Sequence, residues 1–148
     1  MAKDNDNTVY AFSDGSALGN PGPGGYGVVL KYGDNLKELN QGYVHTTNNR
    51  MELMGAIMAL ESLKERQRVV LTTDSQYVIN GIEKGWARKW RANGWMRNRK
   101  ERALNPDMWE RLLRAVDRHE VSFNWVRGHM GHPENERCDE LANGAARG

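Results

Sequence analysis

The chain has little cysteine, no long apolar segment and little net charge, and the first two shortages exclude whole classes of protein. Its 148 residues include one cysteine, Cys138, so no intrachain disulfide can form, which fits a reducing compartment. Residues 1–7 are polar, unlike a secretory signal peptide, and no apolar run approaches the roughly 20 residues that span a bilayer. We therefore expect one cytoplasmic domain over residues 1–148, with a flexible segment at residues 1–7 and no membrane contact.

The net charge of +2 says little about binding partners, but the positive charge is unevenly distributed. Residues 84–104 combine many basic side chains with tryptophan, whereas the remainder of the chain is net acidic. The basic residues of this segment are Lys84, Arg88, Lys89, Arg91, Arg97, Arg99, Lys100 and Arg102, and its tryptophans are Trp86, Trp90 and Trp95. A basic block on a near-neutral domain suggests contact with a polyanion.

Hydrophobic periodicity predicts an α/β fold with a mixed five-stranded sheet flanked by helices. The strands are expected at residues 8–14, 26–32, 37–46, 68–73 and 121–126. The helices are expected from the cap-type residues 46–49 to 64, at 75–83, in a short stretch to 91, at 106–118 and from 133 onward. The first three strands are linked by short turns at residues 20–25 and 33–35, so they should form an antiparallel meander.

Four carboxylates occur where the pattern allows either a structural role or a ligand role. Asp14 and Asp74 each follow a predicted strand, Asp14 before a glycine-rich turn and Asp74 before a helix. Considered alone, Asp14 would start the turn and Asp74 would cap the helix. Glu52 follows Asn49 by three residues, as in a capping box. Asp139 lies beside the apolar stripe of the last helix, where a surface role is the simpler interpretation.

Together, the four acids favour a metal site. Carboxylates at strand ends meet at one edge of an open α/β sheet, and grouped acids repel one another unless cations lie between them. Oxygen ligands with no cysteine or histidine cluster favour Mg²⁺, or Mn²⁺ in its place, over zinc. Two such ions about 4 Å apart would activate a water and stabilise the leaving oxygen in phosphodiester hydrolysis.

Four motifs, in order along the chain, resemble those of bacterial ribonuclease HI, a family that cleaves the RNA strand of RNA–DNA hybrids. They are SDGS at 13–16 running into GNPGPGG at 19–25, TTNNRMEL at 46–53, TDSQY at 73–77, and GHMGHPENERCD at 128–139. The resemblance covers about residues 8–146 and implies a ribonuclease H-like fold and products with 5′-phosphate and 3′-hydroxyl ends.

The resemblance also implies roles for individual residues. The catalytic, metal-binding carboxylates would be Asp14, Glu52, Asp74 and Asp139, with two ions bound in the presence of substrate. His129, on a mobile loop in the family, would assist water activation or product release. Contacts to the RNA strand would come from Gly15, Ser16, Asn48 and Gln76, because reading the 2′-hydroxyl separates RNA from DNA.

Contacts to the DNA strand follow from the same resemblance. Asn20, Thr47 and Asn48 match a phosphate pocket, and Arg50 lies close by in the sequence with either a binding or a structural role. Residues 84–104 match the basic protrusion of the family. Its substrate contacts would be Trp86, Arg88, Lys89 and Arg91, whereas Trp90 and Trp95 would pack the protrusion onto the body.

The sequence departs from the family pattern at two positions in or directly beside these motifs. His45 stands where relatives commonly have arginine in the phosphate pocket, so affinity for the hybrid should be weaker or more dependent on pH. Ser13 replaces the usual threonine, which we interpret as a packing detail.

Two other functions compete with a monomeric Mg²⁺-dependent ribonuclease H. A module that binds hybrids without cleaving them is disfavoured because all four carboxylates are retained. A DNA nuclease of the same fold, such as a resolvase, is disfavoured by the RNA-facing residues Asn48 and Gln76.

Overall fold

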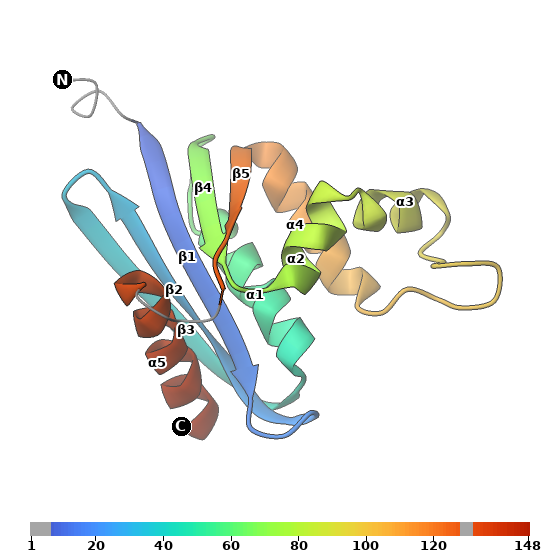
Figure 1. The fold of residues 1–148 in the computed structure, drawn as a ribbon, viewed down its shortest axis with the longest axis horizontal. Helices are drawn as coiled ribbons and strands as arrows, with labels where there is room; N and C mark the ends of the chain where they lie inside the picture. Colours follow the sequence, from blue (N-terminus) through green and yellow to red (C-terminus); the bar gives the residue numbers. More distant parts are fainter. Residues whose placement is uncertain (1–6, 128–131) are drawn as a thin grey trace.

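The computed structural model describes residues 7–127 and 132–148, which form one sheet with helices on both faces (Figure 1). The strands are β1 (Thr8–Ala17), β2 (Gly22–Tyr32), β3 (Asn35–Thr46), β4 (Arg68–Thr73) and β5 (Glu120–Trp125). The helices are α1 (Asn48–Glu61), α2 (Gln76–Glu83), α3 (Trp86–Ala92), α4 (Pro106–Arg118) and α5 (Pro133–Arg147). The predicted fold class and order of elements are confirmed. Within the described ranges, no helix is long and apolar enough to cross a membrane.

The sheet is mixed, with strand order β3-β2-β1-β4-β5. The first three strands form the expected antiparallel meander, and a two-residue turn, Gly33–Asp34, joins β2 to β3. Gly33 has a φ of +58°, a left-handed conformation that suits glycine. Strands β4 and β5 run parallel to β1, so their carboxyl ends lie at the same edge as that of β1.

One face of the sheet carries the main core. Alternate residues of the central strands point toward α1. In β1 and β4 these residues pair in register, Val9 with Val69 and Ala11 with Leu71. All four are buried, as the two-residue period of a strand requires when one face is covered. Helix α5 lies across β1, β2 and β3 on the opposite face (Figure 1).

Strands β1 and β2 are longer than the sequence pattern predicted. We expected β1 to end at Asp14 and residues 20–25 to form a turn, but β1 continues to Ala17 and β2 begins at Gly22. The glycines of β2 explain the difference, because they belong to a strand lying directly under a helix. A Cβ atom at Gly25 or Gly27 would collide with the backbone of α5. This glycine-rich stretch therefore permits close helix–strand packing as well as a turn.

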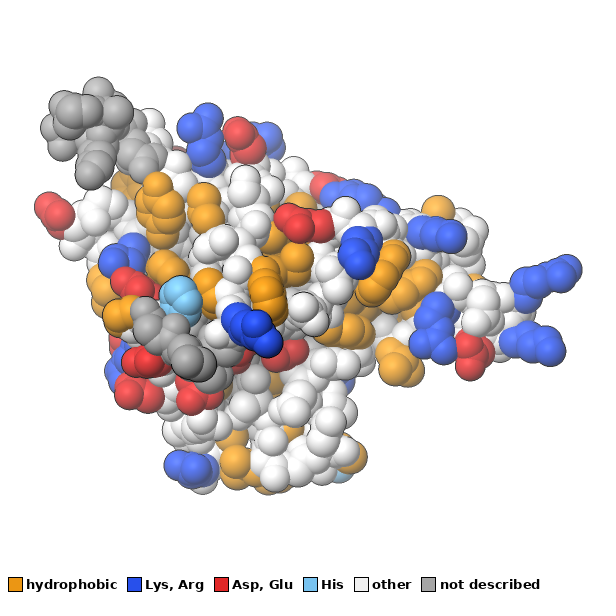
Figure 2. All heavy atoms as spheres, viewed as in Figure 1, with side chains coloured by type: hydrophobic (Ala, Val, Ile, Leu, Met, Phe, Trp, Pro, Cys, Tyr) orange, Lys and Arg blue, Asp and Glu red, His pale blue; other side chains and the backbone are white. Residues whose placement is uncertain are grey.

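Helix α3 and residues 93–104 project from the body of the molecule (Figure 1). Lys and Arg side chains gather at the outer end of this projection (Figure 2). Trp90 and Trp95 pack against the hydrophobic core, as predicted, and the Trp90 ring centroid lies 6.1 Å from that of the buried Trp109. Trp90 and Trp95 therefore pack the base of the projection against the body, while the charged end of the projection faces solvent.

Helices α2 and α4 pack closely because α2 has a glycine at their contact. A Cβ atom at Gly81 would overlap the indole ring of Trp109, which is completely buried. By contrast, a Cβ atom at Gly144, in the interior of α5, would meet nothing within 4 Å. Gly81 is therefore needed for the packing of α2 on Trp109, whereas no neighbouring atom requires a glycine at position 144.

We predict opposite effects on stability for the same substitution at these two sites. Gly81→Ala should lower the free energy of unfolding by about 2 kcal/mol, because a packed ring must move. Gly144→Ala should raise it by about 0.5–1 kcal/mol, because alanine loses less conformational entropy in a helix. Urea denaturation of both variants and the wild type measures these changes. Equal effects of the two substitutions would contradict the proposed packing of α2 on Trp109.

Candidate metal centre

The register between β1 and β4 explains how Asp14 and Asp74 come together. The last paired residues of these parallel strands are Phe12 and Thr72. Asp14 and Asp74 each lie two residues farther along, so they would form the next pair on the same face of the sheet. Strand β4 ends at Thr73. Asp14 therefore lies within β1 but beside the place where its neighbouring strand stops, and the turn-forming role considered for it is wrong.

Glu52 reaches this place from the other face of the sheet. It lies in the second turn of α1, and the backbone of Met51 and Glu52 passes directly over Gly15 of β1. A Cβ atom at Gly15 would collide with that backbone. The glycine after Asp14 thus allows α1 to approach β1 closely and brings Glu52 to the open edge of the strand.

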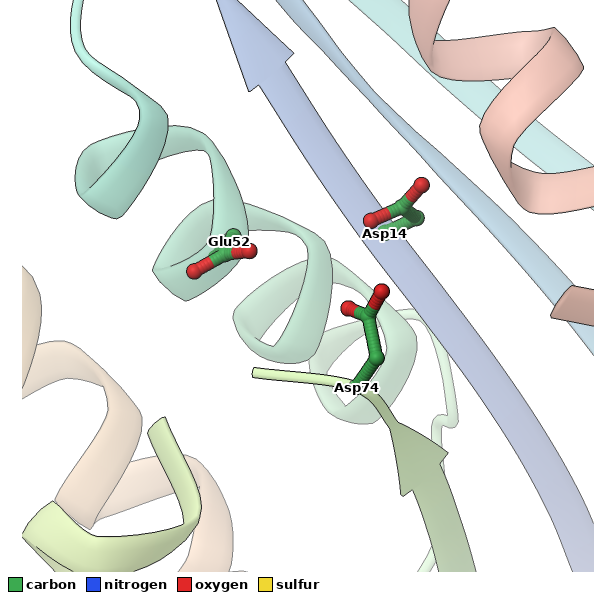
Figure 3. Close-up of side chains that lie close together, drawn as sticks. All are labelled: Asp14, Glu52 and Asp74. Carbon is green, nitrogen blue, oxygen red and sulfur yellow. The ribbon is translucent and has the colours of Figure 1, made fainter. Parts of the chain in front are cut away.

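The three side chains converge on one point (Figure 3). One carboxylate oxygen from each of Asp14, Glu52 and Asp74 lies within 4.8 Å of the other two. Asp139 approaches from α5, on the face of the sheet toward which Asp14 points, and lies close enough to the Asp14 side chain to help raise its pKa. The structure therefore groups three of the four carboxylates that the sequence singled out and places the fourth, Asp139, next to Asp14.

Burial and mutual repulsion disturb the ionisation of this group. Asp14 is only 5% exposed, and burial together with the charges of Asp74 and Asp139 raises its pKa to about 9. Burial also raises the pKa of Glu52, while a hydrogen bond from Ser75 opposes the rise. A divalent cation would relieve both the repulsion and the loss of hydration, and an all-oxygen donor set fits Mg²⁺ or Mn²⁺.

Two structural roles considered for Glu52 and Asp74 are wrong. The N-cap of α1 is Thr47, whose hydroxyl accepts a hydrogen bond from the Arg50 amide at 3.2 Å, so Asn49 and Glu52 do not form a capping box. The N-cap of α2 is Ser75, whose hydroxyl accepts a hydrogen bond from the Val78 amide at 3.1 Å. Neither acid is required to begin a helix.

Ser75 is a site residue that the sequence pattern did not single out. Its hydroxyl donates a hydrogen bond to Glu52 Oε1 at 2.8 Å while capping α2. This pair of bonds orients one oxygen of Glu52 and leaves Oε2 for a ligand. The signal was present in the sequence, because serine is a preferred N-cap and directly follows Asp74.

Trp125 is a second residue that sequence reasoning missed. It ends β5, is 44% exposed, and its indole N–H donates a hydrogen bond to the backbone carbonyl of Asp74 at 3.1 Å. The bond restrains the chain where β4 gives way to the Asp74 turn. A strand-end aromatic beside a carboxylate site is the only sequence signal for it.

Asparagines hold the loops beside the carboxylates. The Ala17 amide donates to Asn48 Oδ1 at 2.6 Å, and the Asn48 amide donates to Asn20 Oδ1 at 3.2 Å. The end of β1, the loop after it and the start of α1 are thereby tied together. Gln76 is the first residue of α2 and is exposed. All of these residues border the same edge of the sheet as the carboxylates.

Arg50 has a structural role. Its guanidinium forms a bidentate ion pair with Asp107, at 2.8 and 3.2 Å, and donates a hydrogen bond to Asn105 Oδ1 at 3.1 Å. Asn105 in turn donates to the Tyr77 hydroxyl. The network joins the starts of α1, α2 and α4, so of the two roles considered for Arg50 the structure supplies the structural one.

A groove of about 430 Å³ runs between the projection and the body. Its lining consists of Tyr77, Trp86, Lys89, Trp90, Arg97 and Trp109. Trp86 is 41% exposed there. Arg88 pairs with Asp117 at 2.7 Å and Arg91 with Glu110 at 3.6 Å. Within the described part of the chain, Lys89, Arg99, Lys100 and Arg102 have no carboxylate partner.

Comparisons with known proteins identify the family. The family model described as RNase H matches residues 6–147. The ribonuclease H of Desulforamulus reducens is 65% identical over 139 residues, covering 94% of this chain and 87% of that protein. The ribonuclease HI of Synechocystis is 56% identical over 137 residues, covering 92% and 86%.

The chain belongs to the ribonuclease H family.

Solved structures agree with this membership. LC9-RNase H1, a type 1 RNase H with the type 2 active-site motif, superposes with a TM-score of 0.85 at 36% identity, covering 95% of this chain and 72% of that one. The fold alone is also shared with LC11-RNase H1, solved in complex with an RNA/DNA hybrid, at a TM-score of 0.72 and 23% identity over 94% and 96% of the two chains.

Two histidines that the family resemblance singled out do not belong to the carboxylate group. His129 lies outside the described residues. His45 is exposed, near the end of β3, just before the strand gives way to the N-cap of α1. This location is compatible with a phosphate contact near Thr47.

Because Asp14 is destabilised by burial and repulsion, removing its charge should stabilise the metal-free ribonuclease H fold. Its pKa is raised in the folded state, so metal-free stability should be complete below about pH 4 and should fall as the pH rises toward about 9. Asp14→Asn should remove this slope and raise the free energy of unfolding at pH 8 by about 2 kcal/mol. Chemical denaturation with chelator across this pH range measures both effects.

Asp34→Asn is the matched control, because Asp34 lies exposed in the Gly33–Asp34 turn. It should leave the pH dependence of stability unchanged. An Asp14→Asn variant with the same slope as the wild type would show that Asp14 does not retain its proton in the metal-free fold.

Proposed function

We propose that the chain is an endonuclease that hydrolyses the RNA strand of RNA–DNA hybrids with Mg²⁺, leaving 5′-phosphate and 3′-hydroxyl ends. The observation that carries the proposal is the convergence of Asp14, Glu52 and Asp74 within 4.8 Å on a ribonuclease H fold. Carboxylates so close, one of them 5% exposed, are a poor arrangement for stability and a good one for binding cations.

The metal ligands in this proposal are Asp14, Glu52, Asp74 and Asp139, with two ions held when substrate is bound. Bound Mg²⁺, or Mn²⁺ in its place, supplies activation of the attacking water and stabilisation of the leaving oxygen. Ser75 keeps Glu52 oriented through the 2.8 Å hydrogen bond, and Trp125 restrains the Asp74 backbone. His129 assists water activation or product release.

The residues bordering the carboxylates bind and orient the hybrid. Gly15, Ser16, Asn48 and Gln76 contact the RNA strand, where the 2′-hydroxyl distinguishes RNA from DNA. Asn20, Thr47 and Asn48 contact a phosphate of the DNA strand. Hydrogen bonds already join Asn20, Asn48 and the Ala17 amide, so this surface is organised before substrate arrives.

The groove beside α3 continues this surface toward the DNA strand. Trp86 offers an exposed ring, and Lys89, which lines the same groove, has its ammonium available for phosphate. Arg88 and Arg91 belong to the same contact surface, but their pairing with Asp117 and Glu110 reduces the charge that they present. We further propose that the enzyme acts as a monomer in the cytoplasm, in keeping with its single, buried cysteine.

Replacing Asp14 tests the chemistry. Asp14→Asn should lower kcat by at least about 100-fold, because even residues that only support metal ligands contribute 10- to 100-fold. Binding of the hybrid should change little, since the phosphate contacts remain. A labelled hybrid incubated with Mg²⁺ measures cleavage, and a filter-binding titration measures affinity.

Three controls make the result specific. Asp34→Asn should retain full activity, and chelator should stop cleavage by the wild type. Single-stranded RNA and duplex DNA of the same sequence should remain uncut. Full activity of Asp14→Asn would refute the assignment, cleavage of duplex DNA would favour a DNA nuclease, and wild-type binding without cleavage would favour a binding module.

Neutralising unpaired cations of the projection should weaken binding and its dependence on salt. In an Asp14→Asn background, which prevents turnover, Lys89, Arg99 and Lys100 are replaced by Gln. The slope of log K against log salt should fall by about one for each phosphate that the variant no longer neutralises. The charge-matched control replaces Lys37, Lys64 and Arg66, which are exposed elsewhere. Equal slopes in the two triple variants would show that the projection does not bind phosphate.

A further inference from the structure

A hydrogen bond joins α5 to the end of β1 beside the carboxylates. The Ser16 hydroxyl donates to Asn143 Oδ1 at 2.8 Å, and both side chains are half-buried. The sequence motifs include Ser16 but do not extend to Asn143. Together with the approach of Asp139 to Asp14, this bond links the side chains of α5 to those of β1.

The two contacts form successive rungs between a helix and a strand. Asp14 and Ser16 are two residues apart on β1, a separation of about 6.6 Å on one face. Asp139 and Asn143 are four residues apart on α5, a separation of about 6.0 Å on one side of the helix. These two spacings match, so the contact between Ser16 and Asn143 lies directly beside the contact between Asp14 and Asp139. A nucleotide whose phosphate lies at the carboxylates must place a neighbouring sugar near Ser16.

The direction of the Ser16 hydrogen bond determines what Ser16 can offer. A hydroxyl has one hydrogen to donate and two lone pairs to accept with. The amide oxygen of Asn143 takes the hydrogen, so the Ser16 oxygen faces its surroundings as an acceptor. A ribose 2′-hydroxyl can donate to such an acceptor, whereas a 2′-hydrogen or a 2′-fluorine cannot.

We propose that Asn143 is a positioning residue for RNA recognition, which holds the Ser16 hydroxyl as an obligatory acceptor for a 2′-hydroxyl of the RNA strand. The inference rests on the proposed function. It adds Asn143 to the residues that recognise RNA, and it specifies that the Ser16 hydroxyl acts as an acceptor. Without Asn143, the Ser16 hydroxyl would rotate, so that it would no longer direct a lone pair at a 2′-fluorine and could donate weakly to it. Loss of Asn143 should therefore relax the discrimination between 2′-hydroxyl and 2′-fluorine, and leave the discrimination against 2′-hydrogen in place.

The test is a scan of single 2′-fluoro and single 2′-deoxy nucleotides along the RNA strand of a hybrid, with Mg²⁺ and the full chain. In the wild type, one position near the cleavage point should show kcat/KM about fivefold lower with 2′-fluoro, the factor expected for one hydrogen bond. In Asn143→Ala, the 2′-fluoro penalty at that position should fall below about twofold while the 2′-deoxy penalty persists. Asn143→Asp, which keeps an acceptor oxygen, should restore the wild-type pattern.

Two further variants separate positioning from a general structural effect. Ser16→Ala should remove the 2′-fluoro discrimination by itself, and adding Asn143→Ala should change it no further. Gly144→Ala, in the same helix and facing open space, should behave as the wild type. Thermal unfolding of each variant confirms folding.

The outcomes distinguish this inference from the function beneath it. A wild type that fails to cleave the unmodified hybrid would refute the proposed function. A wild type that cleaves but shows no position sensitive to 2′-fluoro would overturn only the role of Ser16 and Asn143. An unchanged 2′-fluoro penalty in Asn143→Ala, an equal loss on every substrate, or failure of Asn143→Asp to restore the pattern would also overturn that role.

Discussion

Repulsion among buried carboxylates is the constraint on which the rest of this structure depends. Asp14 keeps a place that is only 5% exposed, next to Glu52, Asp74 and Asp139, and its pKa rises to about 9 as a result. The antiparallel meander, the core beneath α1 and the packing of α5 hold the acids at fixed positions. In the proposed function, cations relieve the repulsion and supply the chemistry.

Close packing through glycine lets separate elements meet at that point. Gly15 admits the backbone of α1, and Gly25 and Gly27 admit α5, so helices on opposite faces both reach the end of the sheet. Because β4 stops at Thr73 while β1 continues to Ala17, the edge of β1 is open where the acids converge. A site formed from both faces of a sheet needs such an opening. In the proposed function, the same opening gives a nucleic acid backbone access to the carboxylates.

Polar side chains near the acids are already oriented by hydrogen bonds within the protein. Ser75 donates to Glu52, Ser16 donates to Asn143, and Asn48 accepts from the Ala17 amide. Each bond removes a rotational freedom that substrate binding would otherwise have to restrict. In the described part of the projection, by contrast, several cations have no carboxylate partner and are exposed, which suits sequence-independent contact with phosphate. In the proposed function, the ordered edge therefore recognises the sugar, and the exposed cations recognise the phosphate charge.

The sequence by itself determined the order of elements, because hydrophobic periodicity reports directly which face of a strand or helix is buried. It also determined the four candidate carboxylates, because two of them follow apolar strands, where acids are unusual, and all four lie in motifs that resemble those of one family. Only the tertiary structure decided that Asp14 lies inside β1, paired with β2, and that Arg50 pairs with Asp107. Only the tertiary structure revealed the hydrogen bonds between Ser75 and Glu52 and between Ser16 and Asn143. These features depend on contacts between residues distant in the chain, and local patterns carry no information about which distant partner will be near.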